Sequence, residues 1–168
     1  MYYLNCFLIY SILGFILETS LAILTKSNFN SGIMFGPWTP IYGIGTVTIL
    51  LLSYYFFMNL HMPRWIETII VFIIVGIFLS CLELIGGILI EKSFDVVFWD
   101  YSDHKFNIGK YISLEMTLVW GVATVLFIYI LNPIFEKLIH KIPFLLTIIL
   151  SLTMLIDLVY TFISNIKK

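Results

Sequence analysis

The stretch IETIIVFIIVGIFLSCLELIGGILI, residues 66–90, is long and apolar enough to cross a lipid bilayer as one α-helix. Such a helix needs about 20 consecutive apolar residues. The whole chain has the same character, because 61% of its 168 residues are hydrophobic, 11% are charged and the mean hydropathy is +1.04. A soluble domain carries about 25% charged residues, which it needs to cover a water-facing surface. The sequence therefore predicts an integral membrane protein.

Further apolar stretches predict an all-α, polytopic membrane helix bundle of about five transmembrane helices, forming a single domain over residues 1–168. The expected spans are residues 2–25, 41–60, 66–90, 113–131 and 143–166. Asn132-Pro133 is expected to end the fourth span, because proline lacks an amide donor and clashes with the preceding turn. The segment IFEKLIHKI, residues 134–142, is amphipathic and is expected to lie in the membrane interface.

Basic residues are divided unequally between the two sides of the predicted bundle. The side with the loops 26–40 and 91–112 and the C-terminus carries six, Lys26, Lys92, Lys105, Lys110, Lys167 and Lys168. The other side carries three, Arg64, Lys137 and Lys141. The positive-inside rule predicts a multi-pass protein of the cell membrane, with its N-terminus outside and its C-terminus and both loops in the cytoplasm.

Two glutamates lie inside predicted spans at matching positions, Glu18 in GFILETSLAIL and Glu83 in CLELIGGILIE. An ionisable group in hydrocarbon is costly and marks a functional-site hypothesis. Glu18 precedes Lys26 by eight residues (26 − 18), and Glu83 precedes Glu91 by eight (91 − 83), which places both acids ~12 Å below the same membrane face. The match favours a parallel internal repeat of residues 2–60 and 66–131, with residues 143–166 as an extra helix.

Small and polar residues at helical spacing predict which way the acids point. These stripes are Ser11, Gly14, Glu18, Ala22 and Thr25; Gly76, Ser80, Glu83 and Gly87; Ser113, Thr117, Gly121 and Thr124; and Thr153, Asp157, Thr161 and Ser164. Because small residues let membrane helices approach closely, Glu18, Glu83 and Asp157 are expected to face the bundle interior. They would act there as protonated, hydrogen-bonded links between helices, line a water-filled cavity, or bind a proton or other cation.

The two polar loops supply the other candidates for a ligand-binding site. Glycines and prolines in GIMFGPWTPIYGIG, residues 32–45, favour tight turns, and the segment is predicted to be rigid and re-entrant or interfacial. An ordinary turn with aromatic anchors in the interface is the alternative. The second loop contains WDYS, residues 99–102, and NIGK, residues 107–110, and its alternative is a loop held by Asx turns at Asp100 and Asn107. The candidate residues of the two loops are Pro37, Tyr42, Trp99, Asp100, Tyr101, Asn107 and Lys110.

At several of these positions the chain resembles the putative ABC-transporter type IV family, small bacterial membrane proteins described as permease-like. The resemblance spans residues 10–133. It rests on Gly14-Phe15 through Glu18, Gly36-Pro37, Pro40-Ile41-Tyr42-Gly43, Leu82-Glu83, Trp99-Asp100-Tyr101-Ser102, Phe106-Asn107, Gly109 and Trp120-Gly121. The family usually has arginine where Ser31 and Lys110 stand here, and serine cannot replace the two-pronged hydrogen bonding of arginine to a carboxylate or phosphate.

Three functions are compatible with these residues. The resemblance and the acids favour a permease-like protein, in which Glu18, Glu83 and Asp157 hold a cationic or proton-coupled ligand beneath two cytoplasmic loops. One alternative is a membrane-embedded enzyme on a lipid-type substrate, with acid–base roles for Asp100, Asp103, Glu83 and Lys110. The other is a structural or regulatory subunit. A non-enzyme is favoured, and catalytic residues are not assigned.

The motifs also bound the partners. No histidine spacing fits a zinc site, so neither a metal nor a cofactor is expected. No GxxxxGK[ST] string is present, so ATP would be bound by another chain. The expected partners are the lipid bilayer, a separate ATPase or other membrane subunit, and further copies of this chain as a homo-oligomer. Without a basic tract, nucleic acid is not expected.

Overall fold

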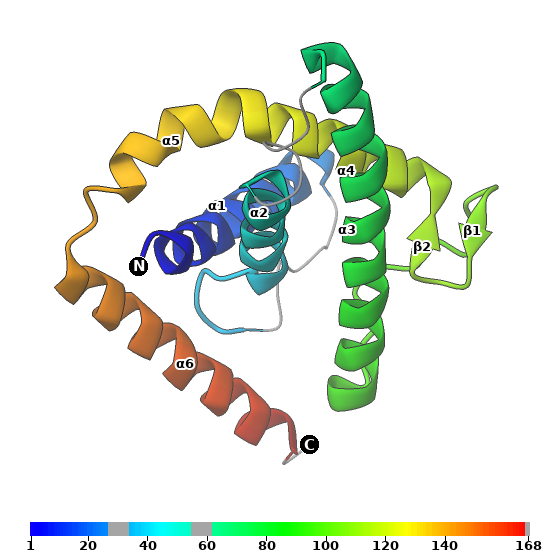
Figure 1. The fold of residues 1–168 in the computed structure, drawn as a ribbon. Coiled ribbons are helices and arrows are strands. Elements are labelled where there is room, and N and C mark those ends of the chain that lie inside the picture. Colours follow the sequence, from blue (N-terminus) through cyan, green and yellow to red (C-terminus); the bar gives the residue numbers. More distant parts are fainter. Residues whose placement is uncertain (27–33, 55–61, 167–168) are drawn as a thin grey trace. The chain divides into compact units, whose positions relative to one another are not determined.

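The computed structural model describes residues 1–26, 34–54 and 62–166 (Figure 1). Its elements in chain order are α1 (Tyr2–Thr25), α2 (Pro40–Leu52), α3 (Arg64–Phe94), β1 (Asn107–Ile108), β2 (Ile112–Ser113), α4 (Leu114–Leu126), the π-helical turn η2 (Phe127–Leu131), α5 (Asn132–Ile139) and α6 (Phe144–Ile166). Almost all regular structure in the described residues is helical, which confirms the all-α prediction.

Four helices within the described residues are long and apolar enough to cross a membrane. They are Tyr2–Thr25, Arg64–Phe94, Leu114–Ile139 and Phe144–Ser164. α2 is shorter, with 13 residues. The predicted second span reaches residue 60, and its last six residues lie outside the described part of the chain. The chain is thus a multi-pass membrane protein.

Two helix ends differ from the prediction. α3 continues past residue 90 to Phe94, where Asp95 adopts a left-handed conformation with φ 54° and donates its amide to the Glu91 carbonyl. The fourth span was expected to stop at Asn132-Pro133, but the helix continues through this pair to Ile139. The π turn η2 lies immediately before Pro133, and the Asn132 amide bonds to the Phe127 carbonyl. This wider turn accommodates the missing proline donor without ending the helix, so residues 134–139 continue the helix that begins at Leu114.

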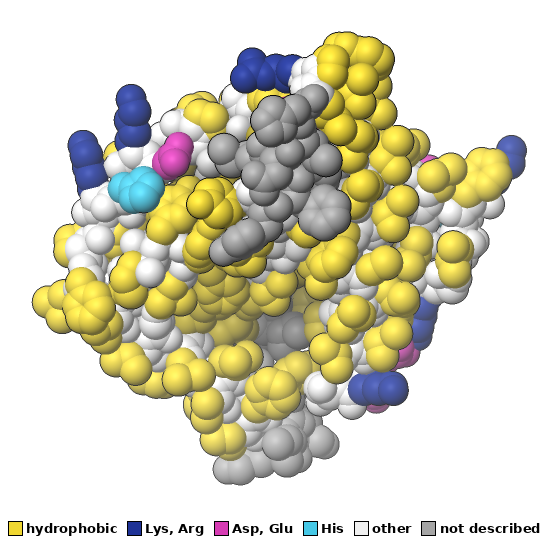
Figure 2. Space-filling model, in the orientation of Figure 1, with side chains coloured by type: hydrophobic (Ala, Val, Ile, Leu, Met, Phe, Trp, Pro, Cys, Tyr) yellow, Lys and Arg dark blue, Asp and Glu magenta, His cyan; other side chains and the backbone are white. Residues whose placement is uncertain are grey.

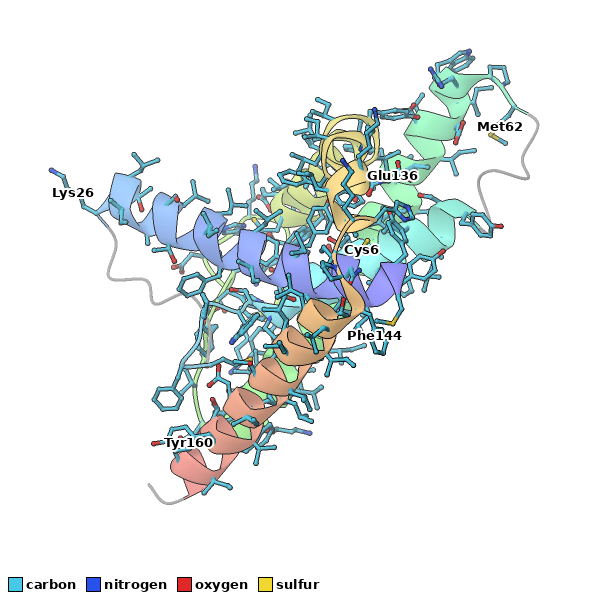
Figure 3. The ribbon with its side chains drawn as sticks, turned by 90° about the vertical axis from the view of Figure 1, so that its left-hand side faces the viewer. Cys6, Lys26, Met62, Glu136, Phe144 and Tyr160 are labelled. Atoms are coloured by element: carbon cyan, nitrogen blue, oxygen red, sulfur yellow. The ribbon has the colours of Figure 1, made fainter. Side chains whose placement is uncertain are left out.

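The chain divides into two compact units. The first consists of residues Met1–Val47 and Glu136–Lys168, and the second of Thr48–Phe135. In the first unit, Leu8, Met34, Trp38 and Met154 form a buried apolar cluster. Asn5 is also buried there, and it accepts a hydrogen bond from the Thr147 hydroxyl (2.6 Å). Figure 3 shows the start of α1, marked by Cys6, beside the start of α6, marked by Phe144, with the two helices diverging toward Lys26 and Tyr160.

The second unit is built on the close pairing of α3 and α4. A Cβ atom added to Gly76 would lie 3.0 Å from the Thr117 carbonyl oxygen and 3.2 Å from the Gly121 nitrogen. Ser80 and Thr117 share a hydrogen bond of 2.8 Å across this contact. The predicted stripe on α3 is confirmed, since Gly76, Ser80, Glu83 and Gly87 are all buried. Small residues therefore set the distance between the two helices, as expected in a membrane.

The remaining helix surface is apolar. Large aliphatic and aromatic side chains are exposed along all four long helices, including Ile23 and Leu24 on α1, Ile77 on α3 and Ile156 on α6. Hydrophobic side chains also make up most of the face visible in Figure 2. Such a surface suits contact with lipid acyl chains.

Candidate functional site

Glu83 lies on the buried face of α3 and is 5% exposed. Each of its carboxylate oxygens accepts one hydrogen bond, from the Tyr101 hydroxyl to Oε1 (2.7 Å) and from the Trp120 indole to Oε2 (2.8 Å). Both donors are uncharged. Within the described residues, no lysine, arginine or histidine forms an ion pair with Glu83. The acid is therefore held inside the second unit by neutral aromatic donors.

The loop between α3 and α4 brings Tyr101 to this acid. β1 and β2 form a two-stranded antiparallel hairpin, in which Asn107 pairs with Ser113. Gly109 turns the chain with φ +63°, a conformation that glycine adopts without strain. The Tyr101 amide donates to the Lys110 carbonyl (2.8 Å). The position of the Tyr101 hydroxyl thus depends on the hairpin.

Glu91 fastens the hairpin to the end of α3. Lys110 Nζ donates to Glu91 Oε1, and the Tyr111 hydroxyl donates to Oε2 (2.6 Å). The hydrogen bond to Glu91 raises the pKa of Lys110 above its ordinary value. Glu91 lies eight residues after Glu83 (91 − 83), a rise of ~12 Å. Lys110, a candidate ligand-binding residue, is therefore engaged with Glu91 near the end of α3.

Asp100 forms the Asx turn that the sequence analysis gives as the alternative to ligand binding. Its Oδ1 accepts the Ser102 amide (2.9 Å) and hydroxyl (2.5 Å). The Ser102 hydroxyl, followed by the amide, holds the pKa of the Asp100 carboxyl below its ordinary value. Asn107 does not form the same turn, because its side-chain amide donates to the Gly109 carbonyl (2.8 Å). Both side chains thus serve the conformation of the loop.

Glu18 lies on α1 in the first unit, where it is half-buried. Its side chain is hydrogen-bonded to that of Tyr42 on α2. The Tyr42 ring covers Gly14, where an added Cβ atom would lie 2.4 Å from the ring. The Glu18 stripe is buried only at Ser11 and Gly14, since Thr25 is exposed. Glu18 and Tyr42, which the sequence analysis names separately as candidate residues, are therefore neighbours in the first unit.

Asp157 lies on α6 and binds backbone rather than a side chain. Its Oδ1 accepts the Phe35 amide (3.2 Å) and its Oδ2 accepts the Gly36 amide (2.8 Å). An added Cβ atom on Gly36 would lie 2.2 Å from the Trp38 indole nitrogen and 2.9 Å from Asp157 Oδ2. The carboxylate therefore holds the segment that leads into α2. On the predicted α6 stripe, Thr161 is buried and Thr153 is exposed.

Replacing Asp157 with alanine is expected to loosen this segment. The Phe35 and Gly36 amides would lose their acceptor, so their hydrogen exchange should accelerate by about tenfold, equivalent to ~1.4 kcal/mol for the pair. Hydrogen-exchange mass spectrometry of the peptide containing residues 34–38 measures this. Thr153→Ala, an exposed α6 position, is the matched control. Unchanged exchange in Asp157→Ala would contradict the assignment.

Two further candidate residues lie in the loops. Trp99 packs edge-on against Tyr111 with ring centroids 6.2 Å apart, and its buried indole nitrogen has no acceptor among the described residues. Pro37 is exposed beside Gly36. Ser31, where the family resemblance departs, lies outside the described residues. Trp120 and Glu91 also belong to the site, although the sequence analysis does not name them as candidate residues. An aromatic residue directly before a helix-packing glycine is the signal that could have identified Trp120.

The chemistry available to these side chains is narrow. No group of three or more histidine, cysteine, aspartate and glutamate side chains in residues 1–26, 34–54 and 62–166 is arranged to hold a metal ion. A buried carboxyl with neutral donors can take up or release a proton, or exchange its donors for a cation. Glu83 is thus the best-defined candidate site, and Glu18 is the next.

The chain matches the model of a family described as putative ABC-transporter type IV over residues 5–163. The match covers both units, both glutamates and the hairpin. No curated protein and no solved structure matches the chain.

Proposed function

Because the chain belongs to the putative ABC-transporter type IV family, we propose that it is a permease-like protein in which Glu83 binds or relays a proton or another small cation. One observation carries the proposal. The Glu83 carboxylate is 5% exposed and each oxygen accepts a hydrogen bond from an uncharged aromatic donor. Ionisation there is costly unless a cation arrives, so proton or cation exchange at this group is coupled to its surroundings.

The hairpin supplies the coupling in this proposal. Tyr101 belongs to the extramembrane loop, whereas Trp120 belongs to α4. Displacement of the hairpin breaks the Tyr101 bond and leaves the Trp120 bond in place. Glu83 then becomes accessible from the loop side, which the distribution of basic residues assigns to the cytoplasm. In this arrangement the loop acts as a cover for a carboxylate site.

Engagement of the loop side chains supports transport over enzymatic acid–base work. Lys110 is bound to Glu91, and Asp100 is bound to Ser102. A general base must lie within reach of a substrate proton, and these two groups are used to hold the loop. If ATP drives transport, a separate ATPase subunit binds and hydrolyses it, because the chain has no phosphate-binding loop motif.

Glu83→Gln tests the proposal because it keeps the size of the side chain and removes its charge. The amide oxygen can accept from Trp120 while the amide nitrogen donates to the Tyr101 hydroxyl, so the fold is expected to survive. Proton flux into vesicles with a trapped pH-sensitive dye should fall by about a hundredfold, as expected for loss of a positioned proton-transfer group. Sodium flux under a sodium gradient is measured in parallel.

Glu67→Gln on the same helix is the control, since Glu67 lies in the first turn of α3. It should leave the flux unchanged. A folded Glu83→Gln protein with wild-type flux would contradict the proposal. The proposal would also be contradicted if vesicles containing the wild-type protein showed no more proton or sodium flux than vesicles without protein.

A further inference from the structure

Building on the proposed role of Glu83, we infer that Glu18 is a second copy of the same carboxylate site. In this copy Tyr42 is the positioning residue that corresponds to Trp120, and the ligand is again a proton or small cation. The inference rests on contacts within each unit, which match at several aligned positions on both helices of each pair.

The acid-bearing helices share one register. Phe7 precedes Glu18 by eleven residues (18 − 7), and Phe72 precedes Glu83 by eleven (83 − 72). Eleven residues are about three helical turns, so each phenylalanine lies on the same face as its acid. The segments FLIYSILGFILE, residues 7–18, and FIIVGIFLSCLE, residues 72–83, align without a gap.

The partner helices share a second pattern. TPIYGIGTV, residues 39–47, aligns with TLVWGVATV, residues 117–125. Both have threonine first, an aromatic residue fourth, glycine fifth, a small residue seventh, and threonine and valine at the end. Thr46 and Thr124 are both buried. The same nine-residue pattern thus follows each acid-bearing helix in the chain.

The glycines make equivalent contacts. A Cβ atom on Gly43 would lie 2.4 Å from the Phe7 carbonyl oxygen and 2.7 Å from its ring. A Cβ atom on Gly121 would lie 2.9 Å from the Phe72 carbonyl oxygen and 2.8 Å from its ring. Each pair of helices therefore touches at the same two aligned positions, and only glycine fits there.

The first residues of the two patterns also meet aligned partners. The Thr39 amide donates to the Ser11 carbonyl (3.0 Å). The Thr117 carbonyl lies 3.0 Å from the position of a Cβ atom on Gly76. Ser11 and Gly76 each precede their acid by seven residues (18 − 11 and 83 − 76). Two independent points thus fix the same register.

The aromatic residue then reaches the acid in both units. Tyr42, directly before Gly43, is hydrogen-bonded to Glu18. Trp120, directly before Gly121, donates to Glu83 at 2.8 Å. Both donors are uncharged and belong to aromatic side chains. The same three-part arrangement, an acid, an aromatic donor and a packing glycine, therefore occurs in each unit.

Carbodiimide labelling of the full-length protein in lipid vesicles tests whether the two acids behave as copies. Dicyclohexylcarbodiimide adds to a protonated carboxyl and remains attached as an N-acylurea, which peptide mass spectrometry locates. Glu18 and Glu83 should both be labelled. Tyr42→Phe should increase labelling of Glu18 by about fivefold, the factor for one net hydrogen bond, and leave Glu83 unchanged. Trp120→Phe should do the reverse.

Trp120→Tyr is the matched variant, because it gives Glu83 a tyrosine donor like the one that Tyr42 provides to Glu18. It should return Glu83 labelling to within about twofold of wild type, because a hydrogen bond is regained. Labelling of Glu83 without labelling of Glu18 would overturn the inference. It would not affect the proposed function, which loss of flux in Glu83→Gln would still support. Equal labelling changes at both acids in either variant would also overturn it, because each donor serves only its own acid.

Discussion

Gly43→Ala is expected to cost more stability than any other single methyl group added to the described helix contacts. The new Cβ atom would lie 2.3 Å from the Ser11 hydroxyl and 2.4 Å from the Phe7 carbonyl oxygen. The hydroxyl can rotate, but the carbonyl belongs to the α1 backbone. The helices must therefore move apart, at a cost of about 3 kcal/mol, the upper part of the range for overpacking.

The matching glycines provide a ranked test. Gly121→Ala should cost less, because its nearest contacts are 2.8 Å away on the movable Phe72 ring. Gly76→Ala should cost least of the three, with its nearest contact at 3.0 Å. Denaturant or thermal unfolding in one detergent gives the order, and Ile44→Ala, which truncates an exposed side chain beside Gly43, is the control. A Gly43→Ala protein as stable as Ile44→Ala would contradict the close α1–α2 contact.

Glu83→Leu is expected to destabilise the second unit by about 2 kcal/mol. The Tyr101 hydroxyl and the Trp120 indole would each lose the carboxylate acceptor that they have in the wild type. Removing an acceptor from a buried donor costs ~1–3 kcal/mol, and bonds between membrane helices lie at the lower end of that range. Thermal unfolding of the purified protein measures the loss, with Glu83→Gln as the variant that keeps both contacts.

A double variant separates the two donors. Combining Glu83→Leu with Tyr101→Phe removes the hydroxyl as well as its acceptor, so part of the lost stability should return. The remaining loss belongs to Trp120 and to the shape of the leucine side chain. If Glu83→Leu were more stable than the wild type, the two hydrogen bonds would not support the fold, and an acid retained at such a cost would be retained for function alone.

Sequence periodicity predicted the α3 surface well. Membrane helices approach one another through small residues. The spacing of Gly76, Ser80, Glu83 and Gly87 therefore identifies the face of α3 that is buried. The same reasoning was less successful on α1, where burial covers Ser11 and Gly14 but not Thr25. Periodicity identifies a face, but it does not show how far along a helix the neighbour extends.

The long-range partners were beyond the reach of sequence patterns. The sequence predicts a loop at Glu91 and therefore does not predict its pairing with Lys110, whereas α3 extends to Phe94 in the structure. Asp157 was grouped with the other acids, yet the groups it contacts are backbone amides, which every residue except proline carries. Pro133 was expected to stop a helix, and the π turn before it shows why that rule failed here.

The Asp157 contact has a consequence for the order in which the protein acquires its structure during synthesis. The Trp120–Glu83 bond joins residues 37 positions apart, whereas the Gly36–Asp157 bond joins residues 121 positions apart. The ribosome therefore releases everything needed for the first of these bonds long before α6 exists. The segment around Gly36 therefore gains its Asp157 acceptor only after α6 has been synthesised, later than Glu83 gains Trp120.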